Sequence, residues 1–231
     1  MHRGFYYGFD PTYLFLVPAL LLSFWAQAKV SSAYNKYSKV RTFTGYTGQQ
    51  IARMILDAAG LYDIPIEIVN SHLGDHYDPR SRVLRLSPEV YNGATIAAAG
   101  IAAHECGHAM QHAESYSPLR MRNSIAPVVN FSQSFSWILF IAGLILSVKP
   151  LVYIGIIMFS AVVAFQIITL PVEFNASNRA LKILDSRSIL YGDELKGAKK
   201  VLEAAAMTYV AAAIMAISQL VRLIAISNRN D

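Results

Sequence analysis

FSQSFSWILFIAGLILSVKPLVYIGIIMFSAVVAFQIITL, residues 131–170, contains a single charged residue, Lys149, and is the segment from which the architecture of the chain can be predicted. About 20 consecutive apolar residues cross the hydrocarbon core of a bilayer as one helix. The stretch is about twice that length and is interrupted by Lys149-Pro150. It therefore predicts two membrane-spanning helices, over residues 131–148 and 151–170, which a tight link joins into a hairpin.

Two further apolar segments flank this hairpin. Residues 13–28 are about long enough to span a bilayer and predict an N-terminal anchor. Because Ala26-Gln27-Ala28 resembles a signal-peptidase site, a cleaved signal peptide is the alternative, although the flank before it carries little positive charge. Residues 204–226 predict a fourth span. Since that segment contains Gln219 and Arg222, an amphipathic helix packed on the other three is the alternative.

The composition agrees with a membrane protein. Of 231 residues, 54% are hydrophobic and 15% are charged, whereas charged residues make up about 25% of a soluble domain. The net charge of +5 fits cytoplasmic loops that face anionic lipid, so we expect no nucleic-acid partner. A single cysteine, Cys106, excludes an intramolecular disulfide and a CxxC metal site, and it fits a reducing compartment.

The lysines and arginines predict the orientation of the chain. Ten lie in residues 29–130 and six in residues 171–203, while the hairpin link has only Lys149 and the N-terminus only Arg3. Because lysine and arginine are enriched in cytoplasmic loops, both polar segments are expected in the cytoplasm and the N-terminus outside. The predicted organisation is an N-terminal span (1–28), a peptidase domain (29–130), a transmembrane hairpin (131–170), a second polar segment (171–203), and a C-terminal helix with its tail (204–231).

The polar segment between the first two spans predicts helices and short strands. Apolar residues at helical spacing favour a helix over residues 48–59, which Gly60 ends. Residues 64–69 and 82–86 predict strands, and residues 75–80 predict a turn. The alternation in residues 82–86 indicates an exposed strand, which we interpret as an edge that pairs with an extended substrate; an ordinary sheet strand is the alternative. Residues 94–113 predict a helix.

That last helix carries His104-Glu105-Cys106-Gly107-His108, an HExxH motif. Two residues four apart lie about 40° apart around a helix and about 6 Å apart along it, so both imidazoles can bind one zinc ion. Glu105 can reach the attacking water without binding the metal, and it can act as the general base that takes the proton of this water. The motif therefore predicts a peptidase with one Zn²⁺ per chain.

A catalytic zinc ion takes a third protein ligand and leaves a position for water. Glu173 is the preferred candidate because the hairpin brings the chain back to the membrane face of His108. The alternative for Glu173 is an ion pair with Arg179 or Lys182. His112 is too far along the helix from His104, by about 12 Å, and Glu114 lacks the glycine turn that longer zinc motifs place before a third ligand.

These residues resemble the YugP-type membrane peptidases, the neutral zinc metallopeptidase group, and are more distantly similar to the HtpX-like endopeptidases. The resemblance covers nearly the whole chain, and it is most specific in four stretches: GDHYDP (74–79), RLS (85–87), AAHECGHA (102–109) with Gln111, and PVEFNAS (171–177). It implies His104, His108 and Glu173 as zinc ligands and Glu105 as base, the gluzincin arrangement. It also implies a bacterial plasma membrane and a role in membrane-protein quality control.

The chain departs from the HtpX-like pattern at Ser177, where those enzymes carry an aspartate. A carboxylate there would orient a ligating histidine, so we expect another partner, Asn178 or a backbone carbonyl. His76 or Tyr77 is a candidate donor to the oxyanion, although the same run can be an ordinary turn. Arg179 is a candidate for binding a peptide carboxylate, with an ion pair to a neighbouring acid as the alternative.

The fold class expected from these patterns is mainly α with a small β-sheet, a multi-span membrane protein with a cytoplasmic gluzincin-type domain. The expected function is a zinc endopeptidase that cleaves membrane or membrane-proximal proteins. A non-catalytic zinc-binding scaffold of the membrane and a secreted-side protease are the alternatives. Expected partners are polypeptide substrates and the lipid bilayer, with membrane-protein partners or further copies of the chain also compatible.

Overall fold

The computed structural model of the protein describes residues 10–71 and 74–229. Helices dominate the fold, and three short strands form its single described sheet. The elements, in chain order, are η1 (Pro11–Phe15), α1 (Val17–Tyr37), α2 (Gly48–Ala58), β1 (Ile66–Ile68), β2 (His76–Asp78), β3 (Val83–Leu86), α3 (Pro88–Tyr91), α4 (Ile96–Ala113), α5 (Ser117–Ile145), α6 (Lys149–Ser186) and α7 (Asp193–Arg229).

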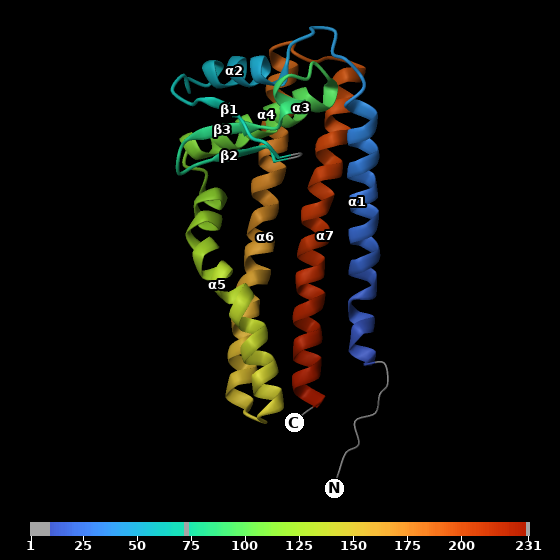
Figure 1. Cartoon of the computed structure of the whole chain (residues 1–231), viewed down its shortest axis with the longest axis vertical. Coiled ribbons are helices and arrows are strands. Elements are labelled where there is room, and N and C mark those ends of the chain that lie inside the picture. Colours follow the sequence, from blue (N-terminus) through green and yellow to red (C-terminus); the bar gives the residue numbers. More distant parts are fainter. Residues whose placement is uncertain (1–9, 72–73, 230–231) are drawn as a thin grey trace.

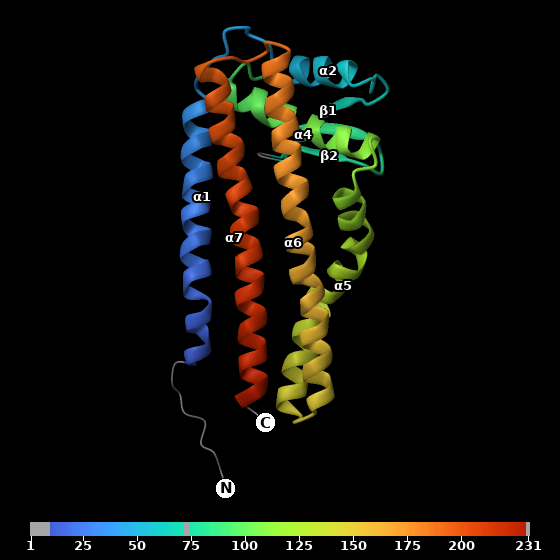
Figure 2. The same ribbon diagram turned by 180° about the vertical axis from the view of Figure 1, so that it is seen from behind.

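Four long helices, α1, α5, α6 and α7, run roughly along one axis, while α2, α4 and the sheet gather at one end (Figure 1). The view from behind shows the same arrangement, with α7 between α1 and α6 (Figure 2). The expected class, mainly α with a small sheet, is therefore confirmed.

The predicted hairpin is present as α5 and α6, which pack along each other. The link is residues 146–148, and Lys149-Pro150 instead begin α6, because proline fits the first turn of a helix, where its missing N–H is not needed. Within residues 10–71 and 74–229, three helices are long and apolar enough to cross a membrane, namely α5, α6 and α7. The fourth apolar segment thus lies in a candidate span.

The first apolar segment forms η1 and the beginning of α1, whereas residues 1–9 lie outside the described chain. α1 is not among the three candidate spans because it continues to Tyr37 through a polar second half. It packs along α7. Arg222 of α7 is buried there, donates to the Thr12 hydroxyl at 3.2 Å and lies 3.9 Å from the ring centre of Tyr13. These contacts explain how an apolar helix accommodates an arginine.

The sheet has the order β1-β3-β2, with β1 parallel and β2 antiparallel to β3. The predictions of an exposed strand and of a substrate-binding edge at residues 82–86 are therefore wrong. β3 is the central strand, and its Leu84 and Leu86 are fully buried. The turn predicted for residues 75–80 is wrong over His76–Asp78, which form the edge strand β2. Pairing on both sides and burial of the leucines place β3 in the centre.

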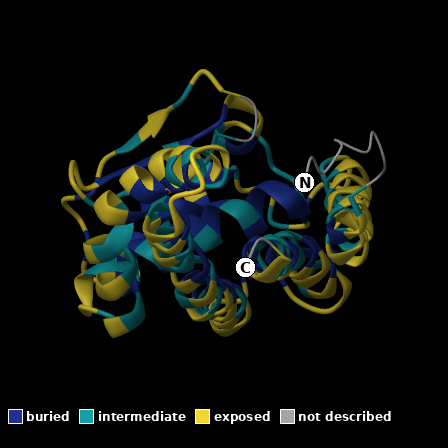
Figure 3. Cartoon of the chain, turned by 90° about the horizontal axis from the view of Figure 1, so that it is seen from below, coloured by how far each residue is buried: buried dark blue, intermediate teal, exposed yellow. Residues whose placement is uncertain are grey.

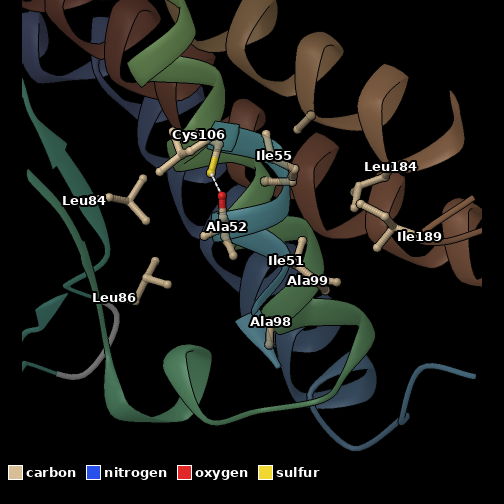
Figure 4. Packing of buried hydrophobic residues seen from close by; sticks show 14 of the residues in the cluster. Ile51, Ala52, Ile55, Leu84, Leu86, Ala98, Ala99, Cys106, Leu184 and Ile189 are labelled. Atoms are coloured by element: carbon tan, nitrogen blue, oxygen red, sulfur yellow. Dashed lines mark hydrogen bonds between the residues drawn. The ribbon is translucent and has the colours of Figure 1, made fainter. Parts of the chain in front are cut away.

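The core at this end lies between α2, α4 and the sheet. Cys106 points into it, fully buried, with its thiol 3.6 Å from the carbonyl oxygen of Ala52, as Figure 4 shows. The α2 helix begins with a capping box, in which Thr47 and Gln50 bind each other's backbone N–H groups. It stops before Gly60, whose φ of +73° favours glycine.

The long helices hold a second apolar cluster, formed by residues such as Phe140, Phe159 and Leu223. Their outward faces remain exposed (Figure 3). Some large apolar side chains on these faces are more than half exposed, for example Ile145 at 76% and Ile157 at 69%. A continuous apolar surface of this kind is expected where helices face lipid.

Candidate metal centre

The site is assembled from two helices. α4 presents His104 and His108 one turn apart, and α6 presents Glu173 opposite them. Glu173 Oε2 lies 3.3 Å from His104 Nε2 and 3.5 Å from His108 Nε2. One ligand atom from each of the three residues lies within 4.8 Å of the others. The structure therefore brings together the three residues expected to bind zinc.

This geometry fits a zinc ion. Tetrahedral zinc with ligands at about 2.0–2.1 Å separates neighbouring ligand atoms by about 3.3 Å, close to both distances from Glu173 Oε2. That oxygen is buried and has no hydrogen-bond donor within the described residues. An unpartnered buried carboxylate oxygen is costly, and a metal cation at this point would remove the cost.

The outer nitrogen of His108 has a fixed partner. Gln111 Oε1 lies 3.0 Å from His108 Nδ1, and because this oxygen can only accept, Nδ1 carries the proton and Nε2 is free to bind a metal. The Gln111 amide donates to the carbonyl of Val172 at 2.8 Å and to Asn175 Oδ1 at 2.9 Å. Both contacts fix which way the amide faces. Gln111 thus ties the ligand helix to α6.

His104 Nδ1 lies 3.1 Å from the Ser177 hydroxyl. The expectation that Asn178 or a backbone carbonyl takes this position is therefore wrong, because the serine at the departure point is itself the partner. A hydroxyl can accept the Nδ1 proton, which again leaves Nε2 for a metal. The partner of this ligand carries no charge.

Glu173 is paired, but not with Arg179 or Lys182. Its Oε1 accepts from Arg122 of α5 at 3.1 Å, which leaves Oε2 toward the histidines. Arg179 instead forms a two-bond pair with Glu114, both contacts at 2.7 Å. The arginine therefore faces a neighbouring acid, and Glu114 points away from a ligand position.

Glu105 is buried on α4 and lines the cavities at the metal centre. The backbone N–H of Tyr77 donates to its Oε2 at 3.1 Å. Because β2 is an edge strand, this N–H is not used by the sheet and is available to orient the carboxylate. The sheet edge that reaches the site is thus β2, and its Tyr77 N–H holds Glu105, the expected base.

His76 and Tyr77 lie beside the centre in different ways. The Tyr77 hydroxyl is 2.9 Å from His112 Nδ1. Tyr77 and His112, which follows the HExxH motif, are therefore hydrogen-bonded to each other. His76 lines the smaller cavity, and its Nδ1 lies 2.7 Å from the carbonyl oxygen of Gly74.

The electrostatics of the site reflect burial and the clustered carboxylates. Burial raises the pKa of Asp75, although hydrogen bonds from Ser87 oppose this. Burial lowers the pKa of His108, but the Glu173 carboxylate and the charge of Glu105 outweigh it and the pKa is raised. The negative potential that holds protons here would equally attract a cation.

Gly107 makes the close approach of α4 and α6 possible. A Cβ at this position would lie 2.7 Å from the carbonyl oxygen of Ala176 and 3.1 Å from its Cα. Both are backbone atoms, so any larger residue would push the helices apart. The glycine between the two histidines therefore sets their distance to Glu173.

Two cavities meet at the centre, one of about 190 Å³ and one of about 420 Å³. Sequence reasoning missed Gln111 as a histidine partner, and it missed Arg122 and Tyr209, which line the smaller cavity. Gln111 stands three residues after His108, so its position on the same helix face could have indicated the contact. No local pattern identifies Arg122 or Tyr209, which reach the site from α5 and α7.

Comparison with known proteins agrees with this site. The model of a family described as "Putative neutral zinc metallopeptidase" matches residues 12–228. A protein of Bacillus subtilis (strain 168) named "Putative membrane protease YugP" is 53% identical over 215 residues, which are 93% of this chain and 96% of that protein. No solved structure matches the chain significantly.

Proposed function

This chain belongs to the neutral zinc metallopeptidase family, and from that membership we propose that it is a gluzincin-type endopeptidase that cleaves membrane or membrane-proximal proteins. The observation that carries the proposal is the convergence of His104, His108 and Glu173 on one point, with Glu105 beside them. Residues 29–130 and 171–203 form the peptidase unit in this proposal. The shared core supports it, because Ala180, Leu184 and Leu202 pack with α2, α4 and the sheet.

His104, His108 and Glu173 would hold one zinc ion per chain. When bound, zinc supplies a Lewis acid that polarises a carbonyl and lowers the pKa of water to about 7. Arg122 holds the second oxygen of Glu173, so this carboxylate presents a single oxygen to the ion. Gln111 and Ser177 keep the Nδ1 proton on each histidine, which leaves both Nε2 atoms as ligands.

Glu105 acts as the proton carrier. Its carboxylate accepts a proton from the attacking water and returns it to the amine that leaves when the peptide bond breaks. The Tyr77 N–H, which binds Oε2 at 3.1 Å, keeps the carboxylate in one orientation. The Glu105 side chain is only 8% exposed, and this low exposure strengthens its hydrogen bond with the Tyr77 N–H.

The length of α6 supports a site near the membrane surface. From Lys149 to Glu173 the helix rises by about 36 Å, and the hydrocarbon core is about 30 Å thick. A hairpin link at one face of the bilayer therefore puts Glu173 just beyond the opposite face. The excess of lysine and arginine in residues 29–130 and 171–203 supports the cytoplasmic side for this face, with the N-terminus outside.

Glu105→Gln tests the function. The variant is expected to bind one zinc ion per chain, because Glu105 is not a ligand, but to lose hydrolysis of an unfolded membrane-protein substrate. Glu114→Gln is the matched control, since Glu114 ends the same helix and pairs with Arg179; it should retain activity. Full activity in Glu105→Gln would contradict the assigned role. A wild-type protein that binds zinc but cleaves nothing would point to the non-catalytic scaffold.

A further inference from the structure

The larger cavity at the metal centre, of about 420 Å³, lies between α1, α4 and α7. It shares Asp75, His104, Glu105, Glu173 and Tyr209 with the smaller cavity on the side of β2 and α5. The shared residues include two of the expected zinc ligands and the expected base. A polypeptide that places its scissile bond at this centre would therefore extend into both cavities, one on each side of the bond.

The two cavities differ in size. Binding pockets for small molecules have volumes of about 300–1,000 Å³. The α1-side cavity falls in this range, while the other, of about 190 Å³, lies below it. Among the described residues, the α1-side cavity would thus hold a larger part of a bound polypeptide segment than the smaller cavity.

The walls of the larger cavity have a distinct chemistry. α7 contributes small and aliphatic side chains, namely Val201, Leu202, Ala205 and Ala206. α1 contributes Val30 and four uncharged polar side chains, namely Gln27, Ser31, Tyr34 and Asn35. The charged residues of the lining are Asp75, Glu105 and Glu173, which belong to the metal-centre end.

We propose that this cavity is the principal substrate-binding subsite and takes an uncharged segment of the polypeptide, with α1 as its polar wall. The inference rests on the proposed peptidase function. Aliphatic side chains on α7 suit the apolar side chains of a substrate, and amide and hydroxyl groups on α1 suit its backbone. Away from the metal-centre end, the described lining of the cavity has no charged side chain. A charged substrate side chain there would lose its hydration without gaining an ion-pair partner, which is costly. α1 is thus part of the substrate-binding site in this proposal.

Two neighbouring serines of α1 provide a matched test. Ser31 lines the cavity, whereas Ser32 does not, and both are exposed on the same helix. In Ser31→Phe the ring would occupy the cavity, so we expect at least a tenfold lower kcat/KM for an extended apolar peptide. Ser32→Phe should match the wild type, and both variants should retain one zinc ion per chain. Equal cleavage by both variants would overturn the proposal.

A binding measurement separates this inference from the proposed function. In the Glu105→Gln background, fluorescently labelled β-casein, an unfolded polypeptide, should bind at least tenfold more weakly after Ser31→Phe than after Ser32→Phe. Equal affinities would overturn the cavity assignment even if the wild type is an active protease. Weaker binding after Ser31→Phe, together with a wild-type protein that cleaves nothing, would keep the cavity as a binding site and reject the peptidase.

A change of charge tests the specificity. Gln27→Glu places a carboxylate on the polar wall. Two peptides are compared that differ only in carrying lysine or norleucine on the α1 side of the scissile bond. The ratio of the cleavage rate of the lysine peptide to that of the norleucine peptide should be at least tenfold higher for Gln27→Glu than for the wild type. Ala28→Glu, one residue along and outside the lining, is the control. An unchanged lysine-to-norleucine ratio in Gln27→Glu would contradict an α1 wall in contact with substrate.

Discussion

Gln111 is predicted to control zinc affinity although it does not bind the metal. Its side chain is fully buried and makes three hydrogen bonds, to His108 Nδ1, the Val172 carbonyl and Asn175 Oδ1. Gln111→Leu removes all three and leaves the Nδ1 proton of His108 without an acceptor. At about 1 kcal/mol for each net hydrogen bond, the free energy of unfolding should fall by about 3 kcal/mol.

Zinc binding should weaken in the same variant. Losing the hydrogen-bond partner of a ligating histidine typically weakens metal binding by about 10–100-fold, or about 1.4–2.8 kcal/mol. The assay is competition for zinc against a chelator of known affinity, with purified protein in detergent. Thermal unfolding with and without zinc should show a smaller stabilisation by the metal in Gln111→Leu than in the wild type.

Two further variants separate this role from general destabilisation. His112→Leu removes one hydrogen bond, to the Tyr77 hydroxyl, from the same helix and should leave zinc affinity unchanged. Gln111→Glu keeps an acceptor for His108 but loses the donor to Val172, so it should retain zinc affinity while lowering stability. The reasoning would be refuted by a folded Gln111→Leu protein with wild-type zinc affinity.

Three other outcomes follow from the structure. Gly107→Ala should lower the free energy of unfolding by about 1–3 kcal/mol and weaken zinc binding. Gly100→Ala, whose Cβ would be in ordinary van der Waals contact with Ala198, with its nearest atom at 3.5 Å, should do neither; equal effects in chemical denaturation would contradict the close approach. Glu173→Ala should contain less than one zinc ion per chain by metal analysis, and unchanged content would move the third ligand elsewhere. Burial raises the pKa of Asp75 in the folded protein, so its stabilising contribution is complete below the unfolded value and is lost as the pH rises through the folded value. Zinc-free Asp75→Asn should therefore gain stability relative to the wild type as the pH rises above the usual aspartate pKa, and a difference in melting temperature that does not change with pH would argue against it.

The sequence predicted the elements whose pattern is long and local. The α5–α6 hairpin follows from uncharged length alone, and the helix carrying His104 and His108 follows from its small and apolar residues. The presence of Glu173 near them could be expected because a hairpin returns the chain to the same membrane face. Each of these inferences needs only helix geometry and the thickness of a bilayer.

The sheet could not be ordered from the sequence. Its strands have three or four residues, too few to show an alternation that separates a central from an edge strand. The partners of the metal centre were hidden for a different reason. Arg122 and Tyr209 come from helices far apart in the chain, and their positions depend on how α5 and α7 pack. Ser177 occupies the position where the HtpX-like enzymes carry an aspartate. Because a serine there is uncharged, the sequence did not identify it as the hydrogen-bond partner of His104.

The metal centre joins a helix of the polar end to a helix that continues along the candidate membrane hairpin. Neither helix carries the three ligands by itself, and the contact at Gly107 forms only when both have packed. A chain that ends before α6 would therefore lack Glu173, the third residue of the candidate zinc site. The candidate site would therefore be assembled only after the chain has been made as far as Glu173 and α6 has packed on α4.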